Sequence, residues 1–150
     1  MKTCVSTYSF GSYVDRLGIL GVIDKVAEMG FDGNEFCDGG WTNGLDLEIA
    51  AQCKARAQEK GLALVSYCIG ADFLYGSGGD LDAEVARVCR QVDFAAALGV
   101  ANMRHDVAGV PQPGKGASDW WGIDYDSVLP RLAEGIRRVA DYAASKGVAP

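Results

Sequence analysis

The sequence has a single histidine, His105, and none of its cysteines form a C-x-x-C pair. Structural zinc sites usually combine closely spaced cysteines with further cysteines or histidines, so a zinc finger is excluded. The five cysteines are odd in number and widely spaced, which also argues against a small disulfide scaffold. We therefore expect reduced thiols, and for Cys68 we favour a packing role over a reactive one.

Long apolar runs and an excess of positive charge are missing as well. No segment approaches the roughly 20 apolar residues needed to cross a bilayer, and the first residues lack the hydrophobic region of a signal peptide. The 14 basic residues are scattered and outnumbered by 20 acidic ones, which argues against a nucleic-acid backbone as the main partner. We expect a cytoplasmic protein that binds neither membranes nor nucleic acid.

What the sequence does contain is a junction that occurs four times. In each copy an amphipathic helical pattern ends in a glycine and passes directly into a short apolar segment; the glycines are Gly30, Gly61, Gly99 and Gly147. Glycine just past a helix end can adopt the left-handed conformation that lets the chain turn back into a strand. The pattern predicts strands over residues 3–8, 31–36, 62–68 and 100–105, each followed by a helix, with Asp80 and Asp126 as caps of the third and fourth helices.

Strands separated by helices must pair in parallel, which leaves an open doubly wound sheet or a closed barrel. The turn after the first strand, residues 6–12, has one glycine and no G-x-G-x-x-G phosphate cradle, so the barrel is favoured. A (β/α)8 TIM barrel needs ~250 residues. We therefore expect residues 1–150 to form a single domain that contains the first four βα units of such a barrel. This barrel is expected to be truncated and to be completed by a further polypeptide segment or by association with another molecule.

The segment from Leu20 to Phe36, and above all its G-F-D-G-N-E-F stretch, resembles the first helix and second strand of the xylose-isomerase-like sugar phosphate isomerases and epimerases. The run from Val5 to Phe10 is similar to the first strand of that family. The resemblance implies a metal-dependent sugar enzyme whose ligands lie on strands five to eight. A divalent metal (Mn, Mg, Zn or Co) is thus expected only with the second half of the barrel, and no metal ligand is assigned in this chain.

Active sites of such barrels lie at the carboxyl ends of the strands, which selects the candidate residues. Glu35 matches the glutamate of the family at the end of strand two, and His105, the one side chain with an ordinary pKa near neutrality, stands at the end of strand four. We predict both as catalytic. Predicted substrate-binding residues are the aromatic and basic side chains at these strand ends and in the loops that follow: Tyr8, Phe10, Trp41, Tyr67, Arg104, Trp120 and Trp121.

Successive residues of a strand point to opposite faces, so Arg104 and His105 cannot both face the barrel mouth. We expect His105 to face it and Arg104 to pair with a carboxylate on the helix side. The reverse arrangement would give an arginine able to bind a phosphate or carboxylate.

The predicted function is isomerisation or epimerisation of a sugar or sugar phosphate by metal-assisted proton transfer next to the carbonyl. This activity is expected for the complete barrel, paired with its other half or as a homo-oligomer. Two alternatives stay open: a lyase acting on oxidised glycosides, and a non-catalytic half-barrel that is a fragment or binds a partner.

Overall fold

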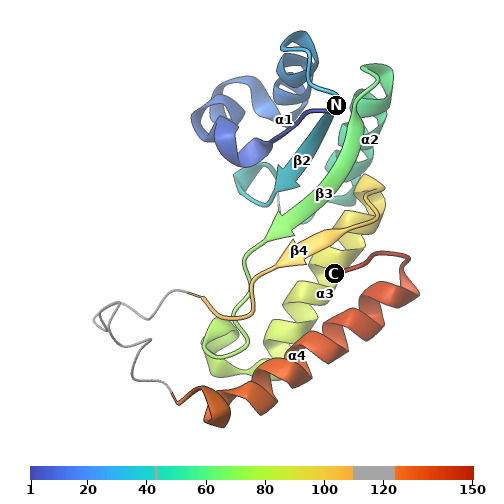
Figure 1. Cartoon of the computed structure of the whole chain (residues 1–150). Helices are drawn as coiled ribbons and strands as arrows, with labels where there is room; N and C mark the ends of the chain where they lie inside the picture. Colours follow the sequence, from blue (N-terminus) through green and yellow to red (C-terminus); the bar gives the residue numbers. More distant parts are fainter. Residues whose placement is uncertain (43, 110–123) are drawn as a thin grey trace.

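The computed structural model describes residues 1–42, 44–109 and 124–150. It has four strands, four longer helices and three short 3-10 helices (Figure 1). The strands are β1 (Cys4–Ser6), β2 (Gly33–Cys37), β3 (Ala63–Ile69) and β4 (Met103–His105). The longer helices are α1 (Gly11–Glu28), α2 (Leu47–Glu59), α3 (Leu81–Leu98) and α4 (Tyr125–Ser145), and the short ones are η1 (Thr7–Phe10), η2 (Gly40–Thr42) and η3 (Gly76–Gly79). No described helix is both long and apolar enough to span a membrane.

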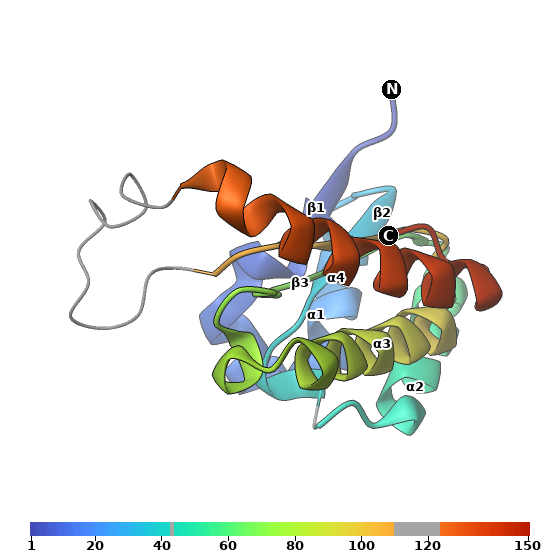
Figure 2. The ribbon, with the colours of Figure 1, turned by 90° about the horizontal axis from the view of Figure 1, so that it is seen from below.

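The four strands form one parallel sheet in the order β1-β2-β3-β4. Each helix packs against the next one in the chain, so that α1 lies on α2, α2 on α3 and α3 on α4. Figure 2 shows α2 and α3 on the same side of the sheet. A doubly wound sheet would reverse its strand order and place helices on both faces. The sequential order therefore confirms the predicted barrel arrangement over the alternative.

The glycine junctions are as predicted. Gly30, Gly61, Gly99 and Gly147 all have positive φ angles, between 71° and 81°, in the left-handed region. Each allows a helix to end and the chain to turn sharply toward the next strand. After the last of them, Ala149 pairs in parallel with Asn102, and its N–H donates to Ala101 O at 2.9 Å. The chain thus begins to pair along the free edge of β4, where a fifth barrel strand would lie.

Two local details differ from the sequence expectation. The first strand ends at Ser6, because the Ser6 hydroxyl accepts a hydrogen bond from the Tyr8 N–H and starts the short helix η1. The fourth helix is capped by Asp124 and not by Asp126. Asp80 caps α3 as predicted, with its carboxylate accepting from the Ala83 N–H. Short polar side chains one or two positions apart compete for a cap, and sequence alone does not choose between them.

The core lies between the sheet and the helices. Phe36, Tyr67 and Phe94 are fully buried there, and Trp41 packs against Phe36 and Phe94 with ring centroids 5.7 Å apart in both pairs. The opposite face of the sheet, which would line the inside of a barrel, is more open, and Val65 is exposed on it. This barrel-facing side is where the polar side chains of the strands come together.

Candidate active site

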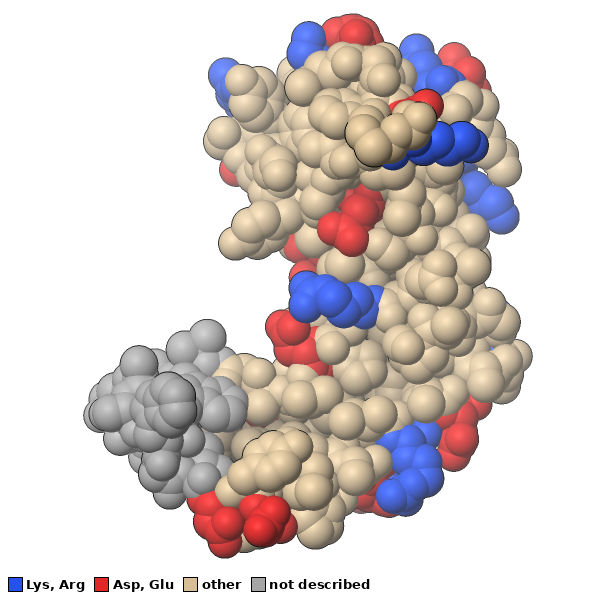
Figure 3. Space-filling view, viewed as in Figure 1, with Lys and Arg blue, Asp and Glu red and all other residues tan. Residues whose placement is uncertain are grey.

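The barrel-facing side carries alternate residues of each strand. Glu35 and Cys37 share it on β2, while Cys68 lies beside Cys37 in register on β3, and Arg104 lies beside Cys68 on β4. Cys37 and Cys68 stand at or next to the carboxyl ends of their strands, the end at which TIM barrels place their active sites, and Glu35 and Arg104 stand at the middle of theirs. Figure 3 shows a hollow on one side of the molecule where acidic and basic side chains lie next to one another.

Glu35 is held in one orientation by its neighbours. The Ser66 hydroxyl donates to Glu35 Oε1 at 2.8 Å. Partial burial tends to raise the pKa of Glu35, but hydrogen bonds from Ser66, Ser6 and Cys68, together with the charge of Arg104, outweigh it and lower the pKa below its ordinary value. The carboxylate is therefore ionised at neutral pH and can accept hydrogen bonds from a ligand.

Two cysteine thiols lie next to this carboxylate. One oxygen of Glu35 and the sulfurs of Cys37 and Cys68 are all within 4.8 Å of one another. The Ser6 hydroxyl is 3.3 Å from Cys37 Sγ. Burial is the largest cause that raises the pKa of Cys68, and the nearby Glu35 charge adds to it, against a hydrogen bond with Arg104. Because its pKa is raised above the ordinary value, Cys68 is a protonated thiol at neutral pH.

Arg104 faces the barrel interior, which is the reverse of the expected arrangement. Its side chain is 66% exposed, its guanidinium donates to Asp106 at 3.0 Å, and it pairs with no helix-side carboxylate among the described residues. A hydrogen bond with Cys68 and the charge of Asp106 raise the pKa of Arg104, so the side chain stays charged. The expectation failed because strand alternation fixes only that neighbouring residues point in opposite directions.

His105 consequently points away from the barrel interior. Its ring lies edge-on to Phe73 with centroids 5.7 Å apart, and its Nδ1 is 2.8 Å from the Asp106 carbonyl oxygen. The predicted catalytic role of His105 stays a prediction, with its ring on the Phe73 side of β4.

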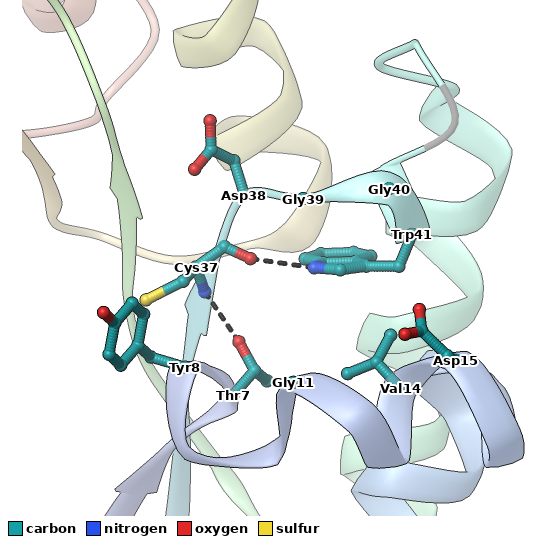
Figure 4. Close-up of a pocket in the computed structure, with 10 residues that line it drawn as sticks. All are labelled: Thr7, Tyr8, Gly11, Val14, Asp15, Cys37, Asp38, Gly39, Gly40 and Trp41. Atoms are coloured by element: carbon teal, nitrogen blue, oxygen red, sulfur yellow. Dashed lines mark hydrogen bonds between the residues drawn. The ribbon is translucent and has the colours of Figure 1, made fainter.

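A pocket of about 250 Å³ opens beside the end of β2 (Figure 4). Among the predicted residues, Tyr8 and Trp41 line it. Tyr8 is 83% exposed, whereas Trp41 is half-buried and its indole N–H donates to Cys37 O at 2.8 Å. Asp38 lines the same pocket, and burial raises its pKa against the opposing charge of Arg87. The pocket thus combines aromatic faces with a carboxyl group whose proton is held more tightly than usual.

A buried ion pair organises the loop after β3. Glu84 is 2% exposed and receives hydrogen bonds from the Arg87 guanidinium, at 2.7 and 3.0 Å, from the Ser77 hydroxyl at 2.7 Å and from the Asp72 N–H at 3.0 Å. These bonds, mainly those from Arg87, lower the pKa of Glu84 to about 2 despite its burial. Arg87 also donates to Gly70 O at 2.7 Å. The pair therefore ties α3 to the segment that follows β3.

Two other predicted substrate-binding residues, Phe10 and Tyr67, do not reach this side. Phe10 is only 8% exposed and lies in the core, and Tyr67 is fully buried with its hydroxyl bound to Gln91 Oε1 at 2.6 Å. Both side chains fill the layer between sheet and helices, and their substrate-binding role stays a prediction. Trp120 and Trp121 lie outside the described residues.

Sequence reasoning missed Cys37 and the Glu84–Arg87 pair. Cys37 follows Glu35 by two positions on the same strand, so period-two alternation would have placed both on one face. Glu84 and Arg87, three positions apart on a helix, look like an ordinary surface pair in the sequence. Only the fold shows that the carboxylate is buried under the β3–α3 segment.

The metal ligands that the family resemblance implies belong to strands five to eight, so the described residues are not expected to form that site. The only histidine faces away from the barrel-facing side, and the one close donor group there consists of Glu35, Cys37 and Cys68. Two sulfurs and one oxygen suit a softer metal than Mg²⁺ or Mn²⁺.

Comparison with solved structures gives the same architecture. The chain resembles a D-psicose 3-epimerase crystallised with D-fructose, with 21% identity and a TM-score of 0.71 over 99% of this chain and 50% of that one. A protein from Sinorhizobium meliloti 1021 matches 97% of this chain and 48% of its own, with 19% identity and a TM-score of 0.69. A xylose isomerase domain protein from Planctomyces limnophilus matches 87% and 47%, with 16% identity and a TM-score of 0.57.

The chain therefore spans about half the length of these structures. At such low identity the likeness establishes the fold alone. No curated protein sequence matches the chain significantly. The model of one protein family does match it, over residues 23–149. With that match, the parallel strand order and the alternating helices, the chain belongs to the xylose isomerase-like TIM barrel family.

Proposed function

We propose that the complete barrel isomerises or epimerises a sugar or a sugar phosphate by proton transfer next to its carbonyl group. The observation that carries the proposal is the ionised Glu35 carboxylate, held by Ser66 close to Arg104 on the barrel-facing side of a chain of this family. Sugars are recognised through hydroxyl groups, for which a fixed carboxylate and a guanidinium are matched partners.

Each described residue has a role that follows from its position. Glu35 accepts a hydrogen bond from a sugar hydroxyl and keeps the ring in one orientation. Asp38, whose pKa is raised, can hold a proton nearer to neutral pH than an ordinary carboxyl group. Tyr8 and Trp41 offer aromatic faces at the pocket for the C–H side of the ring. A divalent metal, when bound by the remaining units, would stabilise the negative charge that develops on the carbonyl oxygen.

We further propose that this chain contributes the first four βα units of the barrel. The supporting observation is the open barrel-facing side, where Val65 is exposed and Arg104 is largely so. Apolar and charged groups on the inside of a barrel are normally covered by the opposite strands. The remaining units would lie in the same polypeptide or in a separate one, and they would close the active site.

Deuterium exchange tests the activity. The complete barrel is incubated in D2O with a panel of aldoses, ketoses and their phosphates, and 1H NMR follows loss of the C–H signal next to the carbonyl. We expect exchange together with formation of an isomer or epimer, and about a hundredfold slower exchange in Glu35→Gln, because the substrate is then less well oriented. Glu28→Gln, which alters an exposed carboxylate on α1, is the matched control and should keep the full rate.

Several outcomes would contradict the proposal. Exchange unaffected by Glu35→Gln would remove the role of that carboxylate. An unsaturated product without an isomer would favour the lyase alternative, and binding without exchange in the complete barrel would favour a non-catalytic protein.

Arg104 provides a test of the substrate class. Its exposed guanidinium is bound to Asp106 through Nη1, which leaves other donors directed at solvent. If the substrate is a sugar phosphate, Arg104→Gln should raise KM for the phosphate about tenfold or more and leave KM for the neutral sugar unchanged. Equal effects on both substrates would refute phosphate binding by Arg104.

A further inference from the structure

We propose that Glu35, Cys37 and Cys68 form a binding site for a thiophilic divalent cation of the Zn²⁺ class on the barrel-facing side of β2 and β3. The ligands come from two strands that this chain itself contains, so the site is separate from the metal expected on strands five to eight. The inference does not depend on the proposed function, because metal binding by the chain can be measured directly.

The geometry of the three donors supports the site. Cys37 and Cys68 are direct neighbours in register on adjacent parallel strands, and Glu35 lies two residues before Cys37 on the same face. All three ligand atoms are within 4.8 Å of one another. Ligand atoms around tetrahedral zinc are about 3.5 to 4 Å apart, as follows from Zn–S and Zn–O distances near 2.3 and 2.0 Å. The site therefore closes around a cation with small side-chain rotations on a rigid sheet.

Neighbouring groups hold the ligands as they do in metal sites. The Ser66 hydroxyl fixes the carboxylate of Glu35, and the Ser6 hydroxyl, which also hydrogen-bonds Glu35, lies 3.3 Å from Cys37 Sγ. Three protein ligands leave one tetrahedral position open for water or a ligand oxygen. Cys37 also lines the pocket of Figure 4, which gives a cation a path from solvent.

The charges balance when the cation binds. Binding releases one proton from each thiol to solvent, so two thiolates and one carboxylate, with three negative charges, surround a divalent cation. The remaining negative charge lies beside the guanidinium of Arg104, which also contacts Cys68. A soft donor set of two sulfurs and one oxygen favours zinc-like metals over Mg²⁺ or Ca²⁺.

Cobalt binding to the reduced chain tests the site. The 150-residue protein is kept in a phosphine reductant without oxygen and titrated with Co²⁺, which gives a thiolate-to-cobalt charge-transfer band in the near ultraviolet. We expect this band at one equivalent, its loss when Zn²⁺ displaces Co²⁺, and no competition from Mg²⁺. Cys37→Ser and Cys68→Ser should each lose about half of the band, and the double variant all of it, because the band scales with the number of thiolates.

Two further variants separate this site from nonspecific thiol binding. Cys89→Ser, which changes a partly buried cysteine on α3, should leave the band unchanged. Ser66→Ala should weaken Co²⁺ binding about tenfold, as loss of a supporting hydrogen bond does in other metal sites. Circular dichroism of each variant verifies the fold.

The proposal is overturned if the reduced wild-type chain shows no charge-transfer band. It is also overturned if the band survives in the Cys37→Ser, Cys68→Ser double variant. A Cys37–Cys68 disulfide in the oxidised chain, found by mass spectrometry, combined with no Co²⁺ binding after reduction, would show a redox pair in place of a metal site.

Discussion

The Glu84–Arg87 ion pair offers a sharp test of the electrostatics of this fold. Replacing Glu84 by Gln keeps the shape of the side chain and removes its charge, which leaves the Arg87 guanidinium without its main partner. The folded-state pKa of Glu84 is about 2, compared with 4.5 for an unperturbed glutamate. A lowering of this size corresponds to a stabilisation of about 3 kcal/mol by the ionised group.

The sign of the pH dependence follows from the direction of the shift. Because folding lowers the pKa, the stabilisation is fully present above pH 4.5 and is lost as the pH falls from 4.5 toward about 2. We therefore expect Glu84→Gln to lower the free energy of unfolding by about 3 kcal/mol at pH 7. The difference between variant and wild type should shrink as the pH approaches 2.

Urea unfolding followed by circular dichroism at several pH values measures this difference. Glu28→Gln removes an exposed partner of Lys25 on the helix surface and should change stability by less than about 0.5 kcal/mol. The reasoning is refuted if Glu84→Gln costs less than about 1 kcal/mol at pH 7, or if its cost is the same at pH 7 and pH 3.

Two further substitutions test the packing. Asn34 is fully buried, and neither polar atom of its side-chain amide has a hydrogen-bond partner among the described residues. Asn34→Leu should therefore raise the free energy of unfolding, measured in a thermal or urea melt, by about 1 kcal/mol. A loss of stability would show that the amide has a hydrogen-bond partner after all. Gly135→Ala should destabilise the protein by about 1–3 kcal/mol, because the added Cβ would lie 2.6 Å from the Phe73 ring. This loss is expected although alanine favours helices more than glycine does. An increase in melting temperature would show that α4 can move away from Phe73 at no cost.

The arrangement of strands and helices was predictable because it depends on local signals. Glycine needs positive φ at a helix end whatever the rest of the chain does, so four glycines in the same context predict four βα junctions, and all four have that conformation. The absence of a phosphate-binding turn after β1 then separates a barrel from a doubly wound sheet.

The orientations of Arg104 and His105 are an example of what local sequence signals cannot predict. Alternation requires that they point in opposite directions but does not say which of them faces the barrel interior. That choice depends on the register of β4, where Cys68 pairs with Arg104 and Ile69 with His105. Register is a property of two strands far apart in sequence, and the sequence of either strand alone does not contain it.

The orientations of Tyr67 and Cys68, which point to the helices and to the barrel interior respectively, have a more specific cause. Asn34 pairs with Leu64, but Phe36 pairs with Tyr67, so β3 carries one extra residue opposite Glu35. Strict alternation from Ala63 would turn Tyr67 toward the barrel interior and Cys68 toward the helices. The bulge reverses both, because it lets Ser66 face Glu35, buries Tyr67 against Gln91 and brings Cys68 beside Cys37.

A single extra residue in β3 thus determines which chemistry the barrel-facing side offers. Without this extra residue, the phenol of Tyr67 would lie beside Cys37, and the group of one carboxylate and two thiols would not form. Bulges concentrate near active sites because they redirect side chains without changing the sheet around them. The glycines at the helix ends therefore predict the fold of this chain, whereas the composition of its site depends on a register shift that becomes visible only when β2 and β3 are paired.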